Sequence, residues 1–195
     1  MKEESLLLLS DLQKLINQVV LIDYTIIILG EFNMSRDYQD AKLFFVDFDD
    51  TFYIHERSDP TYYQRVVKNP DTVYDGYASP NLALIKFLQD HPDAPIYCLT
   101  WASLSLAALP KRACFEKYLP GRQILTITTA TPADKIKAME LIADMKGISY
   151  DNVLLIDDLY TTNEMAREAG FMAITPQRVQ NDEYKKLLSL KGSRD

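Results

Sequence analysis

Residues Lys42–Tyr53 read KLFFVDFDDTFY, and this stretch decides the fold that we predict for the chain. Leu43–Val46 is a short apolar run of leucine, phenylalanine and valine, which is typical of a strand buried on both faces of a sheet. It is followed at once by the polar residues Asp47, Asp49, Asp50 and Thr51. Clustered carboxylates repel one another unless a cation or a proton intervenes. The stretch therefore predicts a buried strand with an acidic tip, although solvated turns also collect aspartates.

The composition is that of an ordinary globular protein, with 47% hydrophobic and 25% charged residues in a chain of 195. This length favours one domain and is sufficient to bury a core. The net charge of −7 and the lack of a long basic run argue against a protein that grips extended nucleic acid. Cys98 and Cys114 are too few for a disulfide framework or a zinc site, and His55 and His91 lie too far apart for a histidine-based metal site.

The N-terminal region predicts a helix that lies outside the pattern of the core. Glu3–Val20 carries leucines at helical spacing, so we expect a helix and connector over residues 1–41 and a core over residues 42–195. This helix either covers a sheet edge or packs on a second copy, and it is the candidate surface for such an association. The acidic start MKEES is unlike a signal peptide, and polar residues interrupt the apolar run Leu15–Leu29, which is shorter than the about 20 residues that a membrane span needs. We therefore expect a cytoplasmic protein.

Downstream of Lys42 the pattern alternates between strands and helices, which predicts a three-layer, Rossmann-like α/β fold, a parallel sheet with helices on both faces. Predicted strands are Leu43–Phe48, Ile96–Thr100, Gln123–Thr128, Val153–Ile156 and Phe171–Ile174. Predicted helices begin at Ser79-Pro80 and cover Ser103–Leu109 and Lys111–Tyr118 (split by Pro110), Pro132–Met145, Thr162–Ala169 and Asp182–Leu190, with Gly147 and Gly170 as stops. Phe52–Ala78 has no clear period, and we expect a small irregular flap or hairpin there.

Polar groups also follow the other predicted strands. Thr100 ends the second, Lys135 begins the helix after the third, and Asp157-Asp158 ends the fourth. The carboxyl ends of parallel strands open on one side of a sheet, where ligands bind. Carboxylates from two strands suit Mg²⁺, a hydroxyl and an ammonium suit phosphate oxygens, and a remaining carboxylate can attack phosphorus while the next acts as general acid and then base.

This order and spacing resemble the haloacid dehalogenase-like hydrolases, a superfamily of mostly Mg²⁺-dependent phosphatases. Their four motifs are matched in order by FFVDFDDT (44–51), IYCLT (96–100), PADKIKAMELIADMKGI (132–148) and VLLIDDLYTTNEMAREAG (153–170). The first motif is fairly specific, and the second is weak alone. The resemblance covers about Leu43–Ile174 and implies hydrolysis through an aspartyl-phosphate.

The resemblance also implies a role for each matched residue. Asp47 is implied as the nucleophile with one oxygen on Mg²⁺, and Asp49 as the general acid and base with its backbone carbonyl on the metal. Thr51 is implied to shape the turn, Thr100 to hydrogen-bond the phosphoryl group and Lys135 to neutralise charge. Asp158 is the favoured direct metal ligand, while Asp157 orients Lys135 or binds the metal through water.

Several alternatives stay open at this point. Lys137 is the weaker rival of Lys135. The family often has Asp or Asn where this chain has Thr162, and the neighbouring Asn163 is the candidate replacement. Trp101 either stacks on a substrate or is buried. Arg57, Lys68 and His55 are further candidates for substrate contact.

The two intervals where this superfamily inserts cap domains are short, namely Phe52–Ala78 and Trp101–Thr131. The resemblance then implies a capless or minimally capped member, with an open site for a large phosphorylated substrate or one closed by a partner subunit. A catalytically silent binding module on the same fold is the alternative function. A phosphate-accepting signalling receiver is disfavoured because receivers place the acid pair first, whereas here it comes last.

Overall fold

The computed structural model describes residues 37–55, 78–101 and 108–192. The chain divides into two compact units, Met1–Asp37 and Tyr38–Asp195. The predicted N-terminal helix lies outside the described residues, and so do the flap residues 56–77. Among the described helices, none is long and apolar enough to cross a membrane.

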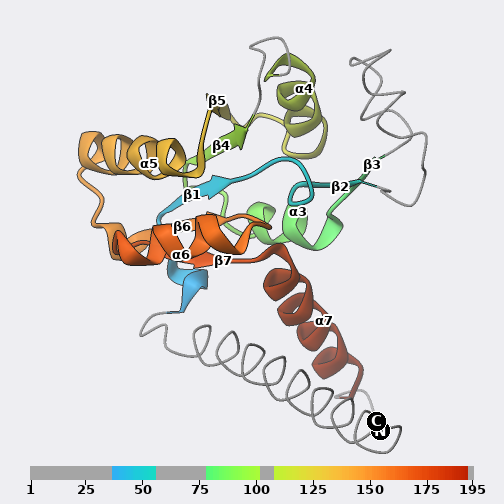
Figure 1. Cartoon of the computed structure of the whole chain (residues 1–195). Helices are drawn as coiled ribbons and strands as arrows, with labels where there is room; N and C mark the ends of the chain where they lie inside the picture. The colour runs from blue at the N-terminus through green and yellow to red at the C-terminus, as the bar shows by residue number, and fades with distance from the viewer. Residues whose placement is uncertain (1–36, 56–77, 102–107, 193–195) are drawn as a thin grey trace, which may run out of the picture. The chain divides into compact units, whose positions relative to one another are not determined.

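The larger unit is an α/β fold (Figure 1). Its strands are β1 (Leu43–Val46), β2 (Tyr53–His55), β3 (Ala78–Pro80), β4 (Ile96–Trp101), β5 (Leu125–Thr129), β6 (Val153–Ile156) and β7 (Met172–Ile174). Its helices are η1 (Tyr38–Asp40), α3 (Leu82–Gln89), α4 (Ala108–Tyr118), α5 (Pro132–Lys146), η4 (Tyr150–Asn152), α6 (Tyr160–Glu168) and α7 (Pro176–Gly192).

Five strands form one parallel sheet in the order β5-β4-β1-β6-β7. The strand β1 lies at its centre, with Val46 opposite Cys98 of β4 on one side and Ile156 of β6 on the other. All four β1 side chains are buried, as the apolar run predicted. The predicted parallel sheet is therefore confirmed, and its acidic strand end lies between two neighbouring strand ends.

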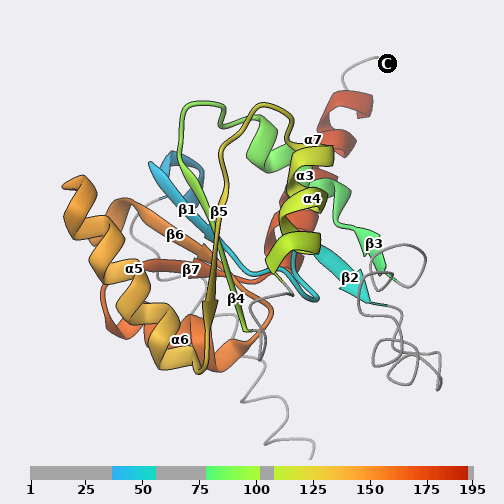
Figure 2. The same ribbon diagram turned by 90° about the horizontal axis from the view of Figure 1, so that it is seen from above.

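Both faces of the sheet are covered by helices, α5 and α6 on one face and α3, α4 and α7 on the other (Figure 2). Alternate β1 residues serve the two faces. Leu43 and Phe45 pack in a core that includes Met139 of α5, whereas Phe44 makes an edge-on contact with Phe87 of α3 at 5.5 Å between ring centroids. The three layers are thus built as the sequence pattern predicted.

The helix α5 shows why its predicted bounds were nearly right. Thr131 caps it by accepting a hydrogen bond from the backbone N–H of Asp134 at 3.2 Å, and Pro132 occupies the first turn. Gly147 ends it in the left-handed conformation at φ 62°. These terminal signals set where the helix begins, and hence where Lys135 lies.

Three helix predictions were wrong in detail. Ser79-Pro80 does not begin a helix, because these residues pair with β2 as the edge strand β3, and Asn81 caps α3 instead. Pro110 lies inside α4 and does not separate it from Lys111–Tyr118, while residues 103–107 of the other predicted helix lie outside the described residues. The last helix begins at Pro176, six residues before the predicted Asp182.

The expected hairpin after the first strand is present at its base. The strands β2 and β3 pair antiparallel, with Tyr53 opposite Pro80 and His55 opposite Ala78. This small sheet leads directly out of the acidic loop after β1.

A hydrogen bond ties the start of the larger unit to its last helix. The Tyr38 hydroxyl donates to Asp182 Oδ2 on α7 at 2.8 Å. Burial would raise the pKa of Asp182, but this hydrogen bond and the charges of Arg178 and Lys185 outweigh it, so that pKa is lowered.

We expect Tyr38→Phe to lower the free energy of unfolding at pH 7 by about 1 kcal/mol. Because the pKa of Asp182 is lower in the folded state, its stabilisation is present above its unfolded value of about 3.9 and is lost as the pH falls through the folded value. Chemical denaturation should therefore show that the difference in the free energy of unfolding between Tyr38→Phe and wild type shrinks as the pH falls from about 5 to about 2.5. Tyr184→Phe, at a 63% exposed tyrosine of the same helix, is the control. A difference that stays constant over this range would contradict the linkage.

Candidate active site

The first component of the site is Asp47, which directly follows β1. Its backbone N–H donates to the carbonyl of Ile156 at 2.9 Å, which extends the ladder between β1 and β6 by one residue. The residue is only 6% exposed. Burial raises the pKa of Asp47 to about 7 against the opposing charge of Lys135, and the nearby Asp157 adds to the rise. A cation bound beside this carboxylate would therefore stabilise its ionised form.

Lys135 is the cation beside it. Lys135 is the fourth residue of α5 and is only 3% exposed. Its Nζ lies 2.9 Å from Asp47 Oδ1 and 2.7 Å from Asp157 Oδ2. Burial would lower the pKa of Lys135, but these two carboxylates outweigh burial and raise it. Lys137, the rival in the sequence, is 75% exposed at its side chain and lies 3.8 Å from Asp134 instead. The structure therefore places Lys135, rather than Lys137, between the carboxylates.

The two acids after β6 have different surroundings. Asp157 is fully buried, and both of its oxygens are engaged: Oδ2 accepts from Lys135 at 2.7 Å and Oδ1 from the backbone N–H of Leu159 at 2.9 Å. Asp158 is half-buried, and its Oδ1 lies 3.5 Å from the Thr51 hydroxyl. The engagement of Asp157 with the lysine favours Asp158 as the more available ligand of the pair.

The loop between β1 and β2 folds back in a single turn. The backbone N–H groups of Phe52 and Tyr53 both donate to the carbonyl of Phe48, at 3.0 and 2.9 Å. Asp50 adopts a positive φ of 55° and accepts from the backbone N–H of His55 at 3.2 Å, so it acts as a turn residue. This turn brings the Thr51 hydroxyl to accept from the backbone N–H of Asp158 at 3.0 Å and joins the ends of β1 and β6.

A second group of polar contacts surrounds Asp49. Its Oδ2 accepts from Lys111 Nζ at 2.6 Å, and the same ammonium donates to the Thr100 hydroxyl at 2.5 Å. His55 Nε2 lies 2.9 Å from Asp49 Oδ1, and since a carboxylate only accepts, this nitrogen carries the proton. Burial would raise the pKa of Asp49, but His55 and Lys111 outweigh it and lower the pKa to about 2.

Three carboxylates form a group that fits a metal ion. One oxygen from each of Asp47, Asp157 and Asp158 lies within 4.8 Å of the others. Oxygen-only ligands with several negative charges are what Mg²⁺ prefers. Burial is the main cause of the raised pKa of Asp47, and the neighbouring charge of Asp157 adds to it, so a divalent cation there would favour the ionised form. The Asp49 side chain faces Lys111 and His55, so a contribution of Asp49 to this group would come from its backbone.

The helix after the acid pair holds the two residues between which the sequence left a choice. Thr162 and Asn163 are both fully buried in α6. Asn163 donates its side-chain amide to the backbone carbonyl of Asp157 at 2.7 Å, and its Oδ1 is buried without a hydrogen-bond partner in the described part of the chain. Asn163 thus supports the turn that presents the acid pair, while the Thr162 hydroxyl, also buried, makes no such contact there.

Four further residues were candidates for substrate contact in the sequence. Trp101 ends β4 with 69% of its surface exposed, so it is not buried. His55 binds Asp49 and the turn rather than standing free for a substrate. Arg57 and Lys68 lie outside the described residues.

Sequence reasoning missed Lys111, which lies beside both Asp49 and Thr100. One signal was present in the sequence. Cys114 and Phe115 follow Lys111 by three and four residues, so all three share one face of α4, and all three are buried. A lysine on the apolar face of a helix is unusual, because lysine is rarely fully buried unless it is paired.

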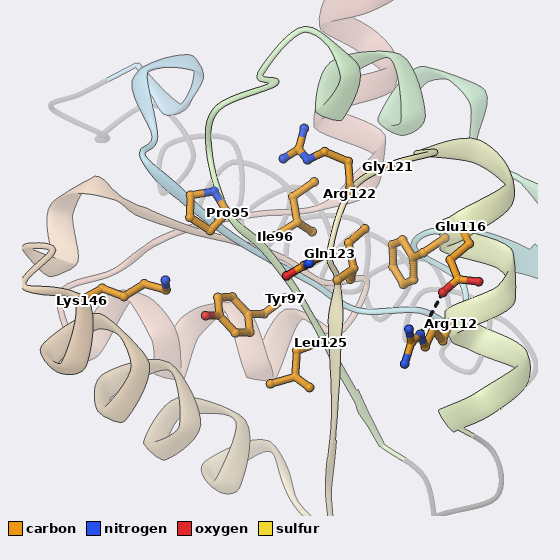
Figure 3. A pocket seen from close by; sticks show the side chains of 12 residues that line it. Pro95, Ile96, Tyr97, Arg112, Glu116, Gly121, Arg122, Gln123, Leu125 and Lys146 are labelled. Atoms are coloured by element: carbon orange, nitrogen blue, oxygen red, sulfur yellow. Dashed lines mark hydrogen bonds and ion pairs between the residues drawn. The ribbon is translucent and has the colours of Figure 1, made fainter.

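A separate cavity of about 700 Å³ lies at the amino-terminal ends of β4 and β5 (Figure 3). Its cationic side chains already have partners within the protein. Arg112 pairs with Glu116 at 2.9 Å, Lys146 lies 5.7 Å from the ring centroid of Tyr97, and Arg122 donates to backbone carbonyls around the end of α3. We therefore place the candidate site at the acidic edge of the sheet, where carboxylates, a hydroxyl and two lysines meet.

No family model and no curated protein sequence matches this chain. Solved structures do resemble it in fold. A HAD family enzyme of Bacteroides thetaiotaomicron in a magnesium complex is 13% identical, with a TM-score of 0.47 over 70% of this chain and 93% of that one. A hypothetical protein of Xanthomonas campestris is 15% identical, with a TM-score of 0.41 over 71% of this chain.

A third similar structure is the N-terminal part of a Bacteroides fragilis protein that contains a phosphatase domain and is complexed with Mg, with 13% identity and a TM-score of 0.44 over 70% of this chain. The chain spans 65% of the Xanthomonas protein and 36% of the Bacteroides fragilis protein. At these identities and TM-scores the function has to be argued from the residues of this chain.

Proposed function

We propose that this chain is a Mg²⁺-dependent phosphomonoester hydrolase that works through an aspartyl-phosphate. The observation that carries the proposal is the buried Asp47 carboxylate, held at the carboxyl edge of the sheet by Lys135 and grouped with Asp157 and Asp158. A nucleophile, a compensating ammonium and a cation-binding group are the parts that such chemistry needs in one place.

The first half of the reaction forms the intermediate. An oxygen of Asp47 attacks phosphorus, the bond between phosphorus and the ester oxygen breaks, and the leaving oxygen takes a proton from Asp49. Because His55 and Lys111 outweigh burial and hold the pKa of Asp49 at about 2, Asp49 takes this proton from solvent before the bond breaks. Lys135 offsets the negative charge shared by Asp47 and the phosphoryl group, and the Thr100 hydroxyl donates to a phosphoryl oxygen.

The second half frees Asp47, and the proton that Asp49 takes up then returns to solvent as its carboxylate re-forms. Asp49 takes a proton from water as the water oxygen attacks phosphorus, the bond from Asp47 to phosphorus breaks, and inorganic phosphate leaves. In this half-reaction Asp49 acts as a base, which is the form that Lys111 and His55 stabilise. A bound Mg²⁺ would supply Lewis-acid polarisation of a phosphoryl oxygen and charge neutralisation.

The residues proposed to hold the metal are Asp47, Asp158 and the backbone carbonyl of Asp49. Asp157 is proposed to orient Lys135, because both of its oxygens are already engaged. The identity of the phosphorylated substrate and association through the N-terminal helix stay predictions from the sequence. A catalytically silent binding module remains the competing function, and turnover separates the two.

Metal removal tests this proposal. We expect the purified chain to hydrolyse an aryl phosphate in the presence of Mg²⁺, to lose at least about 100-fold of that rate after dialysis against a chelator, and to recover it when Mg²⁺ is returned. Calorimetric titration of Mg²⁺ into the dialysed protein gives the metal affinity independently of turnover. Full activity in the chelator would contradict the metal requirement. Mg²⁺ binding with no turnover across a panel of phosphorylated metabolites would favour the silent module.

A further inference from the structure

Lys111 is the least expected residue at the acidic edge. It is 2% exposed and lies in the first turn of α4. Its ammonium donates to Asp49 and to Thr100, and it lies 5.3 Å from the ring centroid of Phe48. No position within the four motifs of the sequence corresponds to it.

The position of Lys111 is costly for stability alone. Moving an ammonium out of water is unfavourable, and its attraction to one carboxylate offsets this only when the geometry is good. Half-buried Asp49 is already hydrogen-bonded by His55, so it does not depend on Lys111 for a partner. A contribution to ligand binding explains the arrangement better than a contribution to folding.

The contact with Thr100 shows what this contribution is. A lysine ammonium only donates, so the Thr100 oxygen accepts in this hydrogen bond at 2.5 Å. A hydroxyl that accepts on one side is left with its own hydrogen to donate elsewhere. Lys111 therefore sets the Thr100 hydroxyl as a donor, which is the role that a phosphoryl oxygen requires of it.

The charges at the edge point the same way. In the described part of the chain, four carboxylates contact Lys111 or Lys135 or belong to the group that fits a metal ion, namely Asp47, Asp49, Asp157 and Asp158. The ammoniums of Lys111 and Lys135 offset half of their charge, and one divalent cation offsets the rest. Without Lys111 these four carboxylates would keep one uncompensated negative charge even with a divalent cation bound, which would disfavour a phosphate dianion.

We propose that Lys111 is a positioning residue that orients the Thr100 hydroxyl toward the phosphoryl group and holds the Asp49 carboxylate in place. Its positive charge also reduces the electrostatic repulsion between the carboxylates of the site and a phosphate dianion. This inference rests on the proposed function and extends it to a residue on a different helix from Lys135. The two lysines then have separate partners. Lys135 forms ion pairs with Asp47 and Asp157. Lys111 contacts Asp49 and Thr100.

The test uses two variants and a control on the same helix. Lys111→Met keeps the length of the side chain without its charge or donors, and Lys111→Gln keeps amide donors without the charge. Lys117→Met, at an exposed lysine of α4, is the matched control. The measurements are kcat and KM for an aryl phosphate with Mg²⁺, the Kd of inorganic phosphate with Mg²⁺ present, the Kd of Mg²⁺ alone, and the midpoint of thermal unfolding.

We expect Lys111→Met to lower kcat by about 10- to 100-fold and to weaken phosphate binding by about tenfold, while the Kd of Mg²⁺ changes less than about threefold. Lys111→Gln should recover part of the loss in kcat, and Lys117→Met should match wild type. In a Thr100→Val background, Lys111→Met should cost less than it does in wild type, because the hydroxyl that it orients is gone. A purely structural role would move the unfolding midpoint without this split.

The outcomes separate this inference from the proposed function. If wild type is active and both Lys111 variants fold with unchanged kcat and unchanged phosphate Kd, the inference is overturned and the proposed function stands. If wild type binds phosphate in a Lys111-dependent manner but does not turn over, the proposed function fails and the positioning role stands. If wild type neither binds phosphate nor turns over, both are overturned. Additive effects of the Lys111 and Thr100 variants would overturn positioning through the hydroxyl.

Discussion

Asp47→Asn should abolish turnover of an aryl phosphate and leave the fold intact. The amide has the shape of the carboxylate but cannot serve as the nucleophile, so we expect the rate to fall by roughly 10⁴-fold or more. The fold should survive because Lys135 keeps its 2.7 Å contact with Asp157. Burial already works against the charge of Asp47, as its pKa of about 7 indicates, so a neutral side chain there removes an unfavourable charge along with the ion pair.

Asp50→Asn is the matched control for this variant. Asp50 lies three residues further along the same loop and serves the turn through its backbone conformation and its contact with the His55 N–H. We expect Asp50→Asn to retain turnover within about fivefold, because asparagine also tolerates a positive φ and can accept the same hydrogen bond. The measurements are initial rates at saturating Mg²⁺ and circular dichroism of both variants. Turnover by Asp47→Asn near the wild-type rate would rule out the aspartyl-phosphate route.

The parallel sheet was predictable from the sequence because its signals are local. Val153–Ile156 is an unbroken apolar run, and the structure has a strand over the same residues. The start of α5 was predicted for the same reason, since the helix was placed from Pro132 and the structure begins it at that residue. When strands alternate with helices and run parallel, their carboxyl ends lie at one edge of the sheet. The proximity of Asp47, Asp157 and Asp158 could therefore be predicted without any knowledge of side-chain positions.

The details that were not predicted depend on tertiary contacts. Ser79-Pro80 carries a strong helix-start signal, but pairing with β2 took those residues into a strand, and Asn81, itself a good cap, became the start of α3. The side-chain direction of Asp49 was equally hidden, because it is set by Lys111, 62 positions away in the sequence. A motif specifies which residues share an edge of the sheet; the packing of α4 and of the turn after β1 decides which partner each of them meets.

Lys135→Met should have the largest combined effect on activity and stability. The methionine leaves Asp47 and Asp157 buried side by side without their shared cation. Removing one partner of a buried ion pair typically costs 3–5 kcal/mol, so we expect the free energy of unfolding to fall by about that amount. Turnover should be lost as well, because the charge on the nucleophile and on the phosphoryl group is no longer offset. Urea denaturation and initial rates measure the two effects.

A second substitution separates these two losses. Asp157→Asn added to Lys135→Met removes one of the two uncompensated charges, so the double variant should recover a large part of the stability without recovering turnover. Lys137→Met, at a 75% exposed lysine two residues away on α5, should match wild type in both measurements. If stability and turnover recovered together, Lys135 would act only by holding the carboxylates in place. If stability recovers alone, the ammonium is needed by the reaction itself, because the double variant is folded yet lacks the charge that Asp47 requires when it meets a phosphate dianion.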